Sequence, residues 1–353
     1  MRPEAAFAIP GDLSTRTGGY IYERRLLETL PEIGQPTRHV ALIPSWPHPT
    51  PEAEADLAAK LDALPRGMAL ILDGLVFGSM DTAVLAAQDR PVIAMLHHPL
   101  GLEAGLPAER AAALIARERA NLAHAAHVVV PSPHTRDILV AQFGVRAEDI
   151  SIALPGFDRP APAPAPAPRA VPPLVLSVGI ICERKGHDVL LRALASLAHL
   201  DWQGAIVGMT HDESVRRSLL ALRGALGLED RVRFTGVIPQ EELDTLYRSA
   251  RVFALATRYE GYGMVLSEAQ MHGLPVVSCA VGAVPRTVPE GSGLLVPPDD
   301  VPAFAAALEA MLRDDAEHAR IAAGSAAQGA ALPHWTDTAA VMRAALDRVR
   351  AGA

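Results

Sequence analysis

Cysteine is scarce in this sequence of 353 residues, and so are aromatic residues. The two cysteines, Cys182 and Cys279, lie inside apolar runs and not at the spacing of metal ligands. A disulfide framework and a cysteine metal site are therefore not indicated, and a reducing cytoplasm is the expected compartment. We expect both thiols to be small core residues.

An excess of positive charge is also missing, because 32 lysines and arginines stand against 40 aspartates and glutamates, a formal net charge of −8. Nucleic acid is not an expected partner, since its binding rests on clustered positive charge. Apolar runs such as residues 68–78 fall short of the roughly 20 residues that a membrane helix needs. No signal peptide is indicated at the amino terminus. The sequence predicts a cytoplasmic protein that is at most peripheral to a membrane, at its inner face.

One segment is dominated by alternating proline and alanine, "RPAPAPAPAPRAVPP" at residues 159–173. So many missing backbone donors exclude helix and sheet and favour an extended, semi-rigid spacer. We therefore expect an amino-terminal domain at 1–158, a linker at 159–173 and a carboxyl-terminal domain at 174–330. Residues 331–353 have the pattern of an amphipathic helix.

On both sides of the linker, short apolar runs alternate with longer helical patterns. Unbroken apolar strands between amphipathic helices are typical of a parallel sheet covered on both faces. The predicted fold class is α/β, with two Rossmann-like domains facing across a cleft. Ligands of such sheets bind at the carboxyl ends of the strands, so the residues after each strand are the candidates for chemistry.

In the first half, two such places carry glycine or histidine. Gly18 and Gly19 lie between the first expected strand and the first helix, where backbone amides can approach an anion. His97 and His98 follow the fourth expected strand, and neighbouring strand residues point to opposite faces. A histidine there can donate to a hydroxyl or an oxyanion, although a structural role is the commoner one for either residue alone. We find no further ligands at a spacing that would indicate a metal.

In the second half, Arg184 and Lys185 stand at the mouth of the expected strand at 173–179, just before a helix that His187 or Asp188 is expected to cap. Two cations at this place can neutralise a diphosphate. Helix amino termini favour acids over bases, so the placement of two bases indicates a bound anion.

The stretch "YEGYGMVLSEAQMHGLP" at 259–275 predicts a loop, a short helix and its glycine stop. Glu260 then lies in the loop, whereas Glu268 lies about one turn into the helix, so the two are not an acid/base dyad. Gly261 and Gly263 free the backbone, so that amides at the helix start can point at a phosphate. Carboxylates beside a phosphate site suit sugar hydroxyls, which indicates a nucleotide sugar.

These segments resemble glycosyltransferase family 4, whose retaining members have the GT-B fold. Residues 260–277 are similar to the E-x7-E signature of the family, and residues 176–193 to its glycine-then-lysine segment. Residues 231–257 and 291–304 resemble its base-binding segment and the segment after the signature. The "TGGY" loop and "HHP" fit the amino-terminal half, so the resemblance covers nearly the whole chain.

The resemblance implies a role for each matching residue. Glu260 would contact the hydroxyls of the transferred sugar, and Glu268 those of the ribose. Lys185, with Arg184, would stabilise the leaving diphosphate. His97, better aligned than His98 with the family histidine, would lie near the sugar and the acceptor. The remaining positions implied to bind the donor are Gly18, Gly19, Val237, Ile238, Gly261, Tyr262, Gly263, Met264 and Val265.

The resemblance implies that the domain at 1–158 binds the acceptor and that the domain at 174–330 binds the nucleotide sugar. It also implies that the helix at 331–353 crosses back to the amino-terminal domain. Transfer is expected with retention, on one face of the sugar, from a UDP- or GDP-sugar. No metal or other cofactor is expected, and a glycan, a lipid or a small molecule could be the acceptor. Many family members have an arginine directly after the glycine matched by Gly179, where this sequence has Ile180. Arg184 could supply that guanidinium. A second departure is Arg286, where relatives often have glutamate.

Three other interpretations stay open at this point. A nucleotide-sugar epimerase of the same fold would release an altered sugar nucleotide with no acceptor. A phosphorylase of this fold would be longer and would hold a pyridoxal cofactor on a lysine. A non-catalytic protein would bind the sugar nucleotide without turnover.

Overall fold

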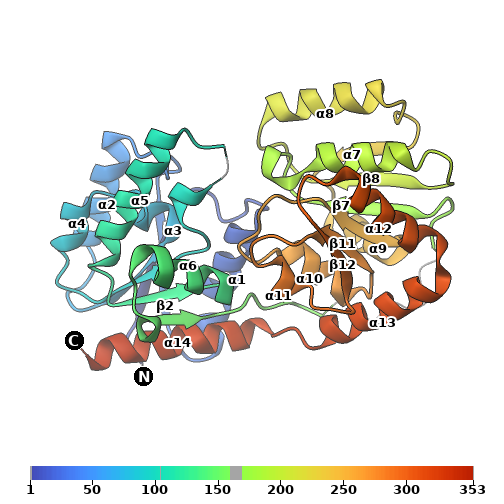
Figure 1. The fold of residues 1–353 in the computed structure, drawn as a ribbon. Coiled ribbons are helices and arrows are strands. Elements are labelled where there is room, and N and C mark those ends of the chain that lie inside the picture. The colour runs from blue at the N-terminus through green and yellow to red at the C-terminus, as the bar shows by residue number, and fades with distance from the viewer. Residues whose placement is uncertain (1, 104, 160–168, 353) are drawn as a thin grey trace. The chain divides into compact units, whose positions relative to one another are not determined.

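The computed structural model describes residues 2–103, 105–159 and 169–352, which form two compact α/β units (Figure 1). The first unit runs to Phe157 and takes up the chain again from Pro333, and the second comprises Asp158–Leu332. Of the expected proline and alanine linker, residues 160–168 lie outside the described residues.

A six-stranded parallel sheet forms the centre of the first unit, in the order β2-β1-β3-β4-β5-β6. All six residues of β1 are buried, as expected of a strand with helices on both faces. The strands are β1 Ala5–Pro10, β2 Thr37–Leu42, β3 Ala69–Asp73, β4 Val92–Met95, β5 His127–Val130 and β6 Ile150–Ile152.

Helices connect these strands, and the carboxyl-terminal helix joins them from the far end of the sequence. Trp335, Met342 and Leu346 of α14 are buried, and α14 packs on α1 and on β3 to β6. The helices are α1 Gly18–Glu32, α2 Pro51–Asp62, α3 Gly74–Phe77, α4 Thr82–Ala86, α5 Ala108–Leu122, α6 Pro133–Phe143 and α14 Trp335–Ala351, with short 3-10 turns η1 Leu100–Leu102 and η2 Ala147–Asp149.

The second unit repeats the plan with a parallel sheet in the order β12-β11-β10-β7-β8-β9. Leu174 and Leu176 of β7 belong to one apolar cluster and Val175 to another, so both faces of the sheet are covered. The strands are β7 Leu174–Val178, β8 Gln203–Val207, β9 Val232–Gly236, β10 Val252–Leu255, β11 Val276–Cys279 and β12 Gly293–Val296. The helices are η3 Glu183–Lys185, α7 His187–Ser196, α8 Glu213–Ala225, α9 Gln240–Ser249, α10 Met264–Met271, α11 Val284–Thr287, α12 Val301–Arg313 and α13 Asp315–Ala330.

Each sheet has one point where the order of connection reverses. In the first unit β1 lies between β2 and β3, and in the second β7 lies between β8 and β10. At such a switch point the loops after the two strands turn to opposite sides and leave a crevice between them, where ligands of these sheets bind. The topology therefore selects the loops after β1 and β3, and after β7 and β10.

Two local predictions are wrong. Cys279 is buried in β11, but Cys182 is only partly buried because it lies in the loop after β7. Neither His187 nor Asp188 caps α7, whose amino-terminal cap is Gly186 in the left-handed conformation with φ 63°. A side chain on Gly186 would place its Cβ 1.9 Å from the carbonyl oxygen of Ala256, so only glycine fits there.

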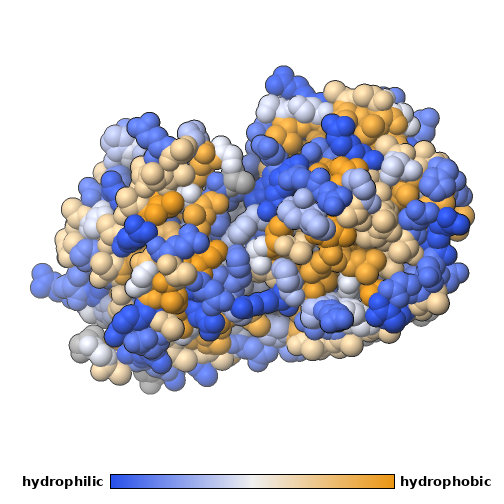
Figure 2. All heavy atoms as spheres, in the orientation of Figure 1, coloured by the Kyte–Doolittle hydropathy of each residue, from blue (hydrophilic) through white to orange (hydrophobic). Residues whose placement is uncertain are grey.

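Figure 2 shows one face of the molecule, coloured by hydropathy. On this face, hydrophilic and hydrophobic residues are interspersed over both units. None of the described helices combines the length and the apolar composition that crossing a bilayer requires.

Candidate active site

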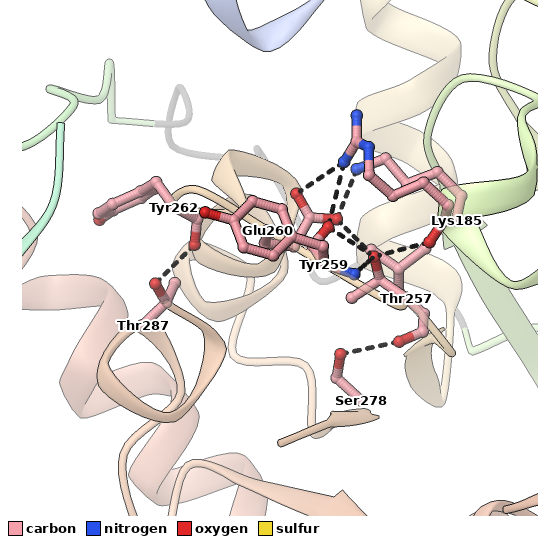
Figure 3. A network of polar contacts seen from close by, with 9 residues as sticks. Lys185, Thr257, Tyr259, Glu260, Tyr262, Ser278 and Thr287 are labelled. Carbon is pink, nitrogen blue, oxygen red and sulfur yellow. Dashed lines mark hydrogen bonds and ion pairs between the residues drawn. The ribbon is translucent and has the colours of Figure 1, made fainter. Parts of the chain in front are cut away.

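A buried ion pair occupies the switch point of the second unit. Nζ of Lys185, from the turn after β7, lies 2.6 Å from Oε1 of Glu260, from the loop after β10. The exposed fractions of the two residues are 8% and 5%. The hydroxyl of Thr257 donates to the same Oε1 at 2.9 Å. Figure 3 shows Lys185 directed at the carboxylate of Glu260 within this network.

A second cation lies on the other carboxylate oxygen. The guanidinium of Arg184 is 3.8 Å from Oε2 of Glu260 and donates to the carbonyl of Tyr259 at 3.1 Å. Burial works to raise the pKa of Glu260, but Lys185 and Arg184 outweigh it, so the pKa lies below its ordinary value. Glu260 is therefore an ionised hydrogen-bond acceptor at neutral pH.

Glycines hold the loop of Glu260 in place. Gly263 has φ 88° and is the amino-terminal cap of α10, so the first amides of this helix have no acceptor within the helix. Gly282 approaches from the turn after β11, where a Cβ would lie 2.4 Å from the carbonyl oxygen of Glu260. Met264 and Val265 are the first residues of α10, where the sequence predicts the start of a helix.

Glu268 has a different environment from Glu260. The hydroxyl of Tyr247, on α9, donates to its Oε2 at 2.9 Å, and the ring of Tyr247 stacks on His272 at 5.0 Å between centroids. Burial raises the pKa of Glu268, while the hydrogen bond from Tyr247 opposes the rise. Sequence reasoning missed Tyr247, because nothing in the pattern of α9 distinguishes a tyrosine that reaches a carboxylate from one in the core.

The other predicted donor-binding residues of this unit lie in the segment after β9 and in the loop after β10. Val237 and Ile238 follow β9, with β8 between that strand and β7. Val237 is 55% exposed, whereas Ile238 packs on the core. Tyr262 accepts a hydrogen bond at its carbonyl from Thr287 at 2.6 Å, which ties Gly261 and its neighbours to α11.

The first unit brings His97 next to the glycine pair. Gly18 and Gly19 are the first residues of α1, and a Cβ on Gly19 would lie 3.5 Å from Cδ2 of His97. The ring of His97 meets that of Tyr22 edge-on at 5.1 Å. The structure thus brings together Gly19 and His97, two predicted residues from separate segments of the chain.

Sequence reasoning missed two carboxyl groups at the same place. Glu23 lies one turn along α1 from Gly19, and its Oε1 is 3.4 Å from Nε2 of His97. Asp73 ends β3, and the ligand-type atoms of Glu23, Asp73 and His97 all lie within 4.8 Å of one another. Asp73 could have been found, because it directly follows an apolar strand, whereas Glu23 carries no such signal.

The sequence and its two halves match known family models. Residues 22–159 match the model described as Glycosyltransferase Family 4, and residues 163–328 match the model described as Glycosyl transferases group 1. A D-inositol 3-phosphate glycosyltransferase 1 of Catenulispora acidiphila is 32% identical over 296 residues, which are 76% of this chain and 70% of that protein. This chain belongs to glycosyltransferase family 4. Other relatives of this kind are matched over about half of their length, as for the Xylanimonas cellulosilytica protein, at 52%.

Solved structures of similar fold agree with the family. Sucrose-phosphate synthase from Thermosynechococcus elongatus superimposes with a TM-score of 0.84 over 100% of both chains, at 24% identity. Anabaena Alr3699/HepE in complex with UDP and glucose gives a TM-score of 0.76, over 98% of this chain and 100% of that chain, at 17% identity. This family 4 glycosyltransferase has the GT-B fold, with two Rossmann-like units.

The structure partly explains one departure from the family pattern, the isoleucine at position 180. Ile180, where an arginine is common, directly follows Gly179. The aliphatic part of Lys185 packs against Gly179, since a Cβ on Gly179 would lie 3.4 Å from Cδ of Lys185. Arg184 supplies a guanidinium near Glu260 from the next turn of the same segment. The structure offers no reason for Arg286, which is exposed on α11.

Proposed function

We propose that this glycosyltransferase moves a sugar from a nucleoside diphosphate sugar to an acceptor hydroxyl, with retention and without a metal ion. The observation that carries the proposal is the buried pair of Lys185 and Glu260 at the switch point, flanked by Arg184 and by the amino terminus of α10. The complex of the structural neighbour with UDP and glucose supports a donor of this class.

Different residues bind different parts of the donor. The first amides of α10 and the cations of Arg184 and Lys185 bind the diphosphate, because a helix amino terminus and two positive side chains favour phosphate oxygens. When the bond to the sugar breaks, negative charge grows on the diphosphate, and Lys185 stabilises it. The ionised Glu260 accepts hydrogen bonds from hydroxyls of the transferred sugar.

The rest of the donor lies along the same edge of the sheet. Glu268 accepts from the ribose hydroxyls, and the backbone of Val237 and Ile238 contacts the base. In the first unit, Gly18, Gly19 and His97 act on the sugar and the acceptor. A glycan, a lipid or a small molecule is the acceptor, and contact with a membrane is at most peripheral.

The sharpest test uses lysine, because Lys60 and Lys185 are the only two in the sequence. Selective isotope labelling of lysine gives two Cε signals, which Lys60→Arg assigns. A panel of UDP- and GDP-sugars is added, and the donor is expected to shift the Lys185 signal and leave that of Lys60 in place. If no nucleotide sugar moves the Lys185 signal, the donor site is wrong.

Products separate this function from its alternatives. Transfer gives a free nucleoside diphosphate together with a glycosylated acceptor, or with free sugar when water replaces the acceptor. An epimerase would give an altered sugar nucleotide without any acceptor, and a binding protein would give no product while still shifting the Lys185 signal. Activity that persists in a metal chelator is expected from a metal-independent enzyme.

A further inference from the structure

Two buried carboxyl groups contact each other beside His97 in the first unit. Glu23, from α1, is 1% exposed, and Asp73, at the end of β3, is 3% exposed. Their side chains are within hydrogen-bond reach of one another. An ionised carboxylate only accepts hydrogen bonds, so two of them in contact must share a proton or a bound cation.

The backbone orients Asp73 in this contact. Its Oδ1 accepts from the amides of Leu75 at 2.9 Å and Val76 at 3.3 Å, because Asp73 caps the short helix α3. Those bonds favour the ionised form of Asp73. Among the residues that the structure describes, no amide donates to Glu23 in this way, and its buried Oε1 has no hydrogen-bond partner.

Among the described residues, no arginine or lysine acts on the pKa of either carboxyl group. The groups that act on their pKa values are each other, His97 and the amide of Leu75. Tyr20 and Tyr22 lie near the cluster, since Glu23 acts on the pKa values of both phenols and Asp73 on that of Tyr20. Asp12 acts on the pKa of Tyr20. The hydroxyl of Tyr22 donates elsewhere, to the carbonyl of Ala153 at 2.9 Å. Burial accordingly raises the pKa of Glu23 to about 7 and that of Asp73 well above its ordinary value.

We propose that Glu23 is a positioning residue for His97: it shares one proton with Asp73 and directs its remaining oxygen, Oε1, at Nε2 of the imidazole. Nε2 lies 3.4 Å from Oε1, and neither atom has a hydrogen-bond partner in the described part of the chain. A shift of a few tenths of an ångström makes this bond and keeps the proton on Nε2. Nδ1 of the neutral ring is then the acceptor.

The role of His97 in transfer rests on the proposed function, but the shared proton does not. The experiment therefore reads the imidazole and needs no donor. The full chain is labelled with ¹³C-histidine, and the His97 signals, assigned by their loss in His97→Asn, are followed from pH 4 to 9. In the wild type they are expected to show a step near pH 7, when the carboxyl pair loses one of its two protons and keeps the shared one, besides the titration of the ring itself.

Two variants test whether the step near pH 7 comes from the pair of Glu23 and Asp73. Glu23→Gln keeps the shape and donates to Asp73 through its amide, so the step near pH 7 is expected to disappear while the ring titration remains. Glu28→Gln makes the same change on an exposed residue of the same helix, which pairs with Arg25, and is expected to keep both steps. A wild type without the step, or a step that survives in Glu23→Gln, overturns the proposal, and the wild-type result does not depend on the folding of Glu23→Gln.

A cation in place of the proton is tested in the same samples. Addition of EDTA, and separately of Mg²⁺ or Zn²⁺, is expected to leave the wild-type His97 signals unchanged. A change with either treatment overturns the shared proton in favour of a cation. Once a donor is known, Glu23→Gln is expected to lower kcat at least tenfold and the donor KM less than twofold, with a changed pH profile. An unchanged kcat and pH profile would show that Glu23 does not act through His97.

Discussion

In both units a buried carboxyl group lies at the switch point of the sheet. The groups that surround it have opposite effects on its pKa in the two units. At the switch point of the second unit, Glu260 meets two cations, Lys185 and Arg184. At that of the first unit, Glu23 meets another carboxyl group, that of Asp73. The pKa of Glu260 lies below its ordinary value and those of Glu23 and Asp73 above theirs.

The difference shows that the strand order determines where the buried carboxyl groups lie. The residues of the neighbouring segments determine whether those groups are ionised. A buried carboxylate is costly in either unit, because water no longer solvates it. Two cations keep one carboxylate charged and leave positive groups for an anionic ligand. A shared proton removes one of the two negative charges of the other pair, which suits uncharged hydroxyls and not an anion. The predictions below test this contrast.

The largest effect is expected from Lys185→Ala, which removes the closest cation of the second unit. Transfer should fall roughly 10²–10³-fold, as for other groups that stabilise developing charge. The free energy of unfolding should fall by about 3 kcal/mol, because Glu260 becomes a buried charge without its main partner. Turnover of the donor and urea unfolding measure the two effects.

Lys60→Ala is the matched control for Lys185→Ala. Lys60 pairs with Asp56 on α2, and its side chain is 40% exposed, so the change should cost less than about 0.5 kcal/mol. Addition of Glu260→Gln to Lys185→Ala should restore more than half of the lost stability. Equal stability of the two single lysine variants would refute the buried-pair account.

A second comparison replaces one glycine in each unit by alanine. Gly186→Ala should cost about 3 kcal/mol, since it adds strain at φ 63° to a clash with the carbonyl of Ala256. Gly19→Ala should change stability by less than about 1 kcal/mol, because the new Cβ contacts His97 at an ordinary distance of 3.5 Å. Gly227→Ala, at φ 66° with nothing within 4 Å, measures the strain alone, about 1 kcal/mol. Thermal unfolding would rank the three, and any other order would contradict the geometry.

The two units should also respond to pH in opposite directions. The folded-state pKa of Glu23 is about 7 against an ordinary 4.5, so its stabilisation is complete below pH 4.5 and is lost as the pH rises to 7. The pKa of Glu260 is lowered, so its stabilisation is present above pH 4.5 and is lost as the pH falls. Relative to the wild type, Glu23→Gln should gain about 2 kcal/mol between pH 4.5 and 7. Glu260→Gln should show no such gain, and parallel curves for both variants would remove the contrast.

The smallest effect is expected from the tyrosines beside each site. Tyr247→Phe should cost about 1 kcal/mol, with the cost rising as pH rises, because its hydroxyl donates to a carboxylate that ionises. Tyr22→Phe should cost about 1 kcal/mol at every pH, because its hydroxyl donates to the carbonyl of Ala153. Chemical unfolding across pH measures both, and a pH-independent cost for Tyr247→Phe would mean that Glu268 does not ionise in that range.

The amino-acid sequence by itself determined the α/β class and the loops that carry the chemistry. Unbroken apolar strands and amphipathic helices are local patterns, and Arg184, Lys185 and Glu260 could be found because each follows such a strand. The family could be read from the same segments. The capping of α7 could not be predicted from the sequence, because the left-handed turn at Gly186 depends on the close approach of Ala256, which follows another strand.

Only the tertiary structure decided which of these groups meet. Lys185 and Glu260 are 75 residues apart, and they pair because β7 and β10 are neighbours in the sheet. Glu23, Asp73 and His97 come from three separate segments, and no local pattern marks Glu23 as buried against another carboxyl group. Strand order brings such residues together, and the partners that it supplies decide whether a buried carboxylate keeps its charge or takes up a proton.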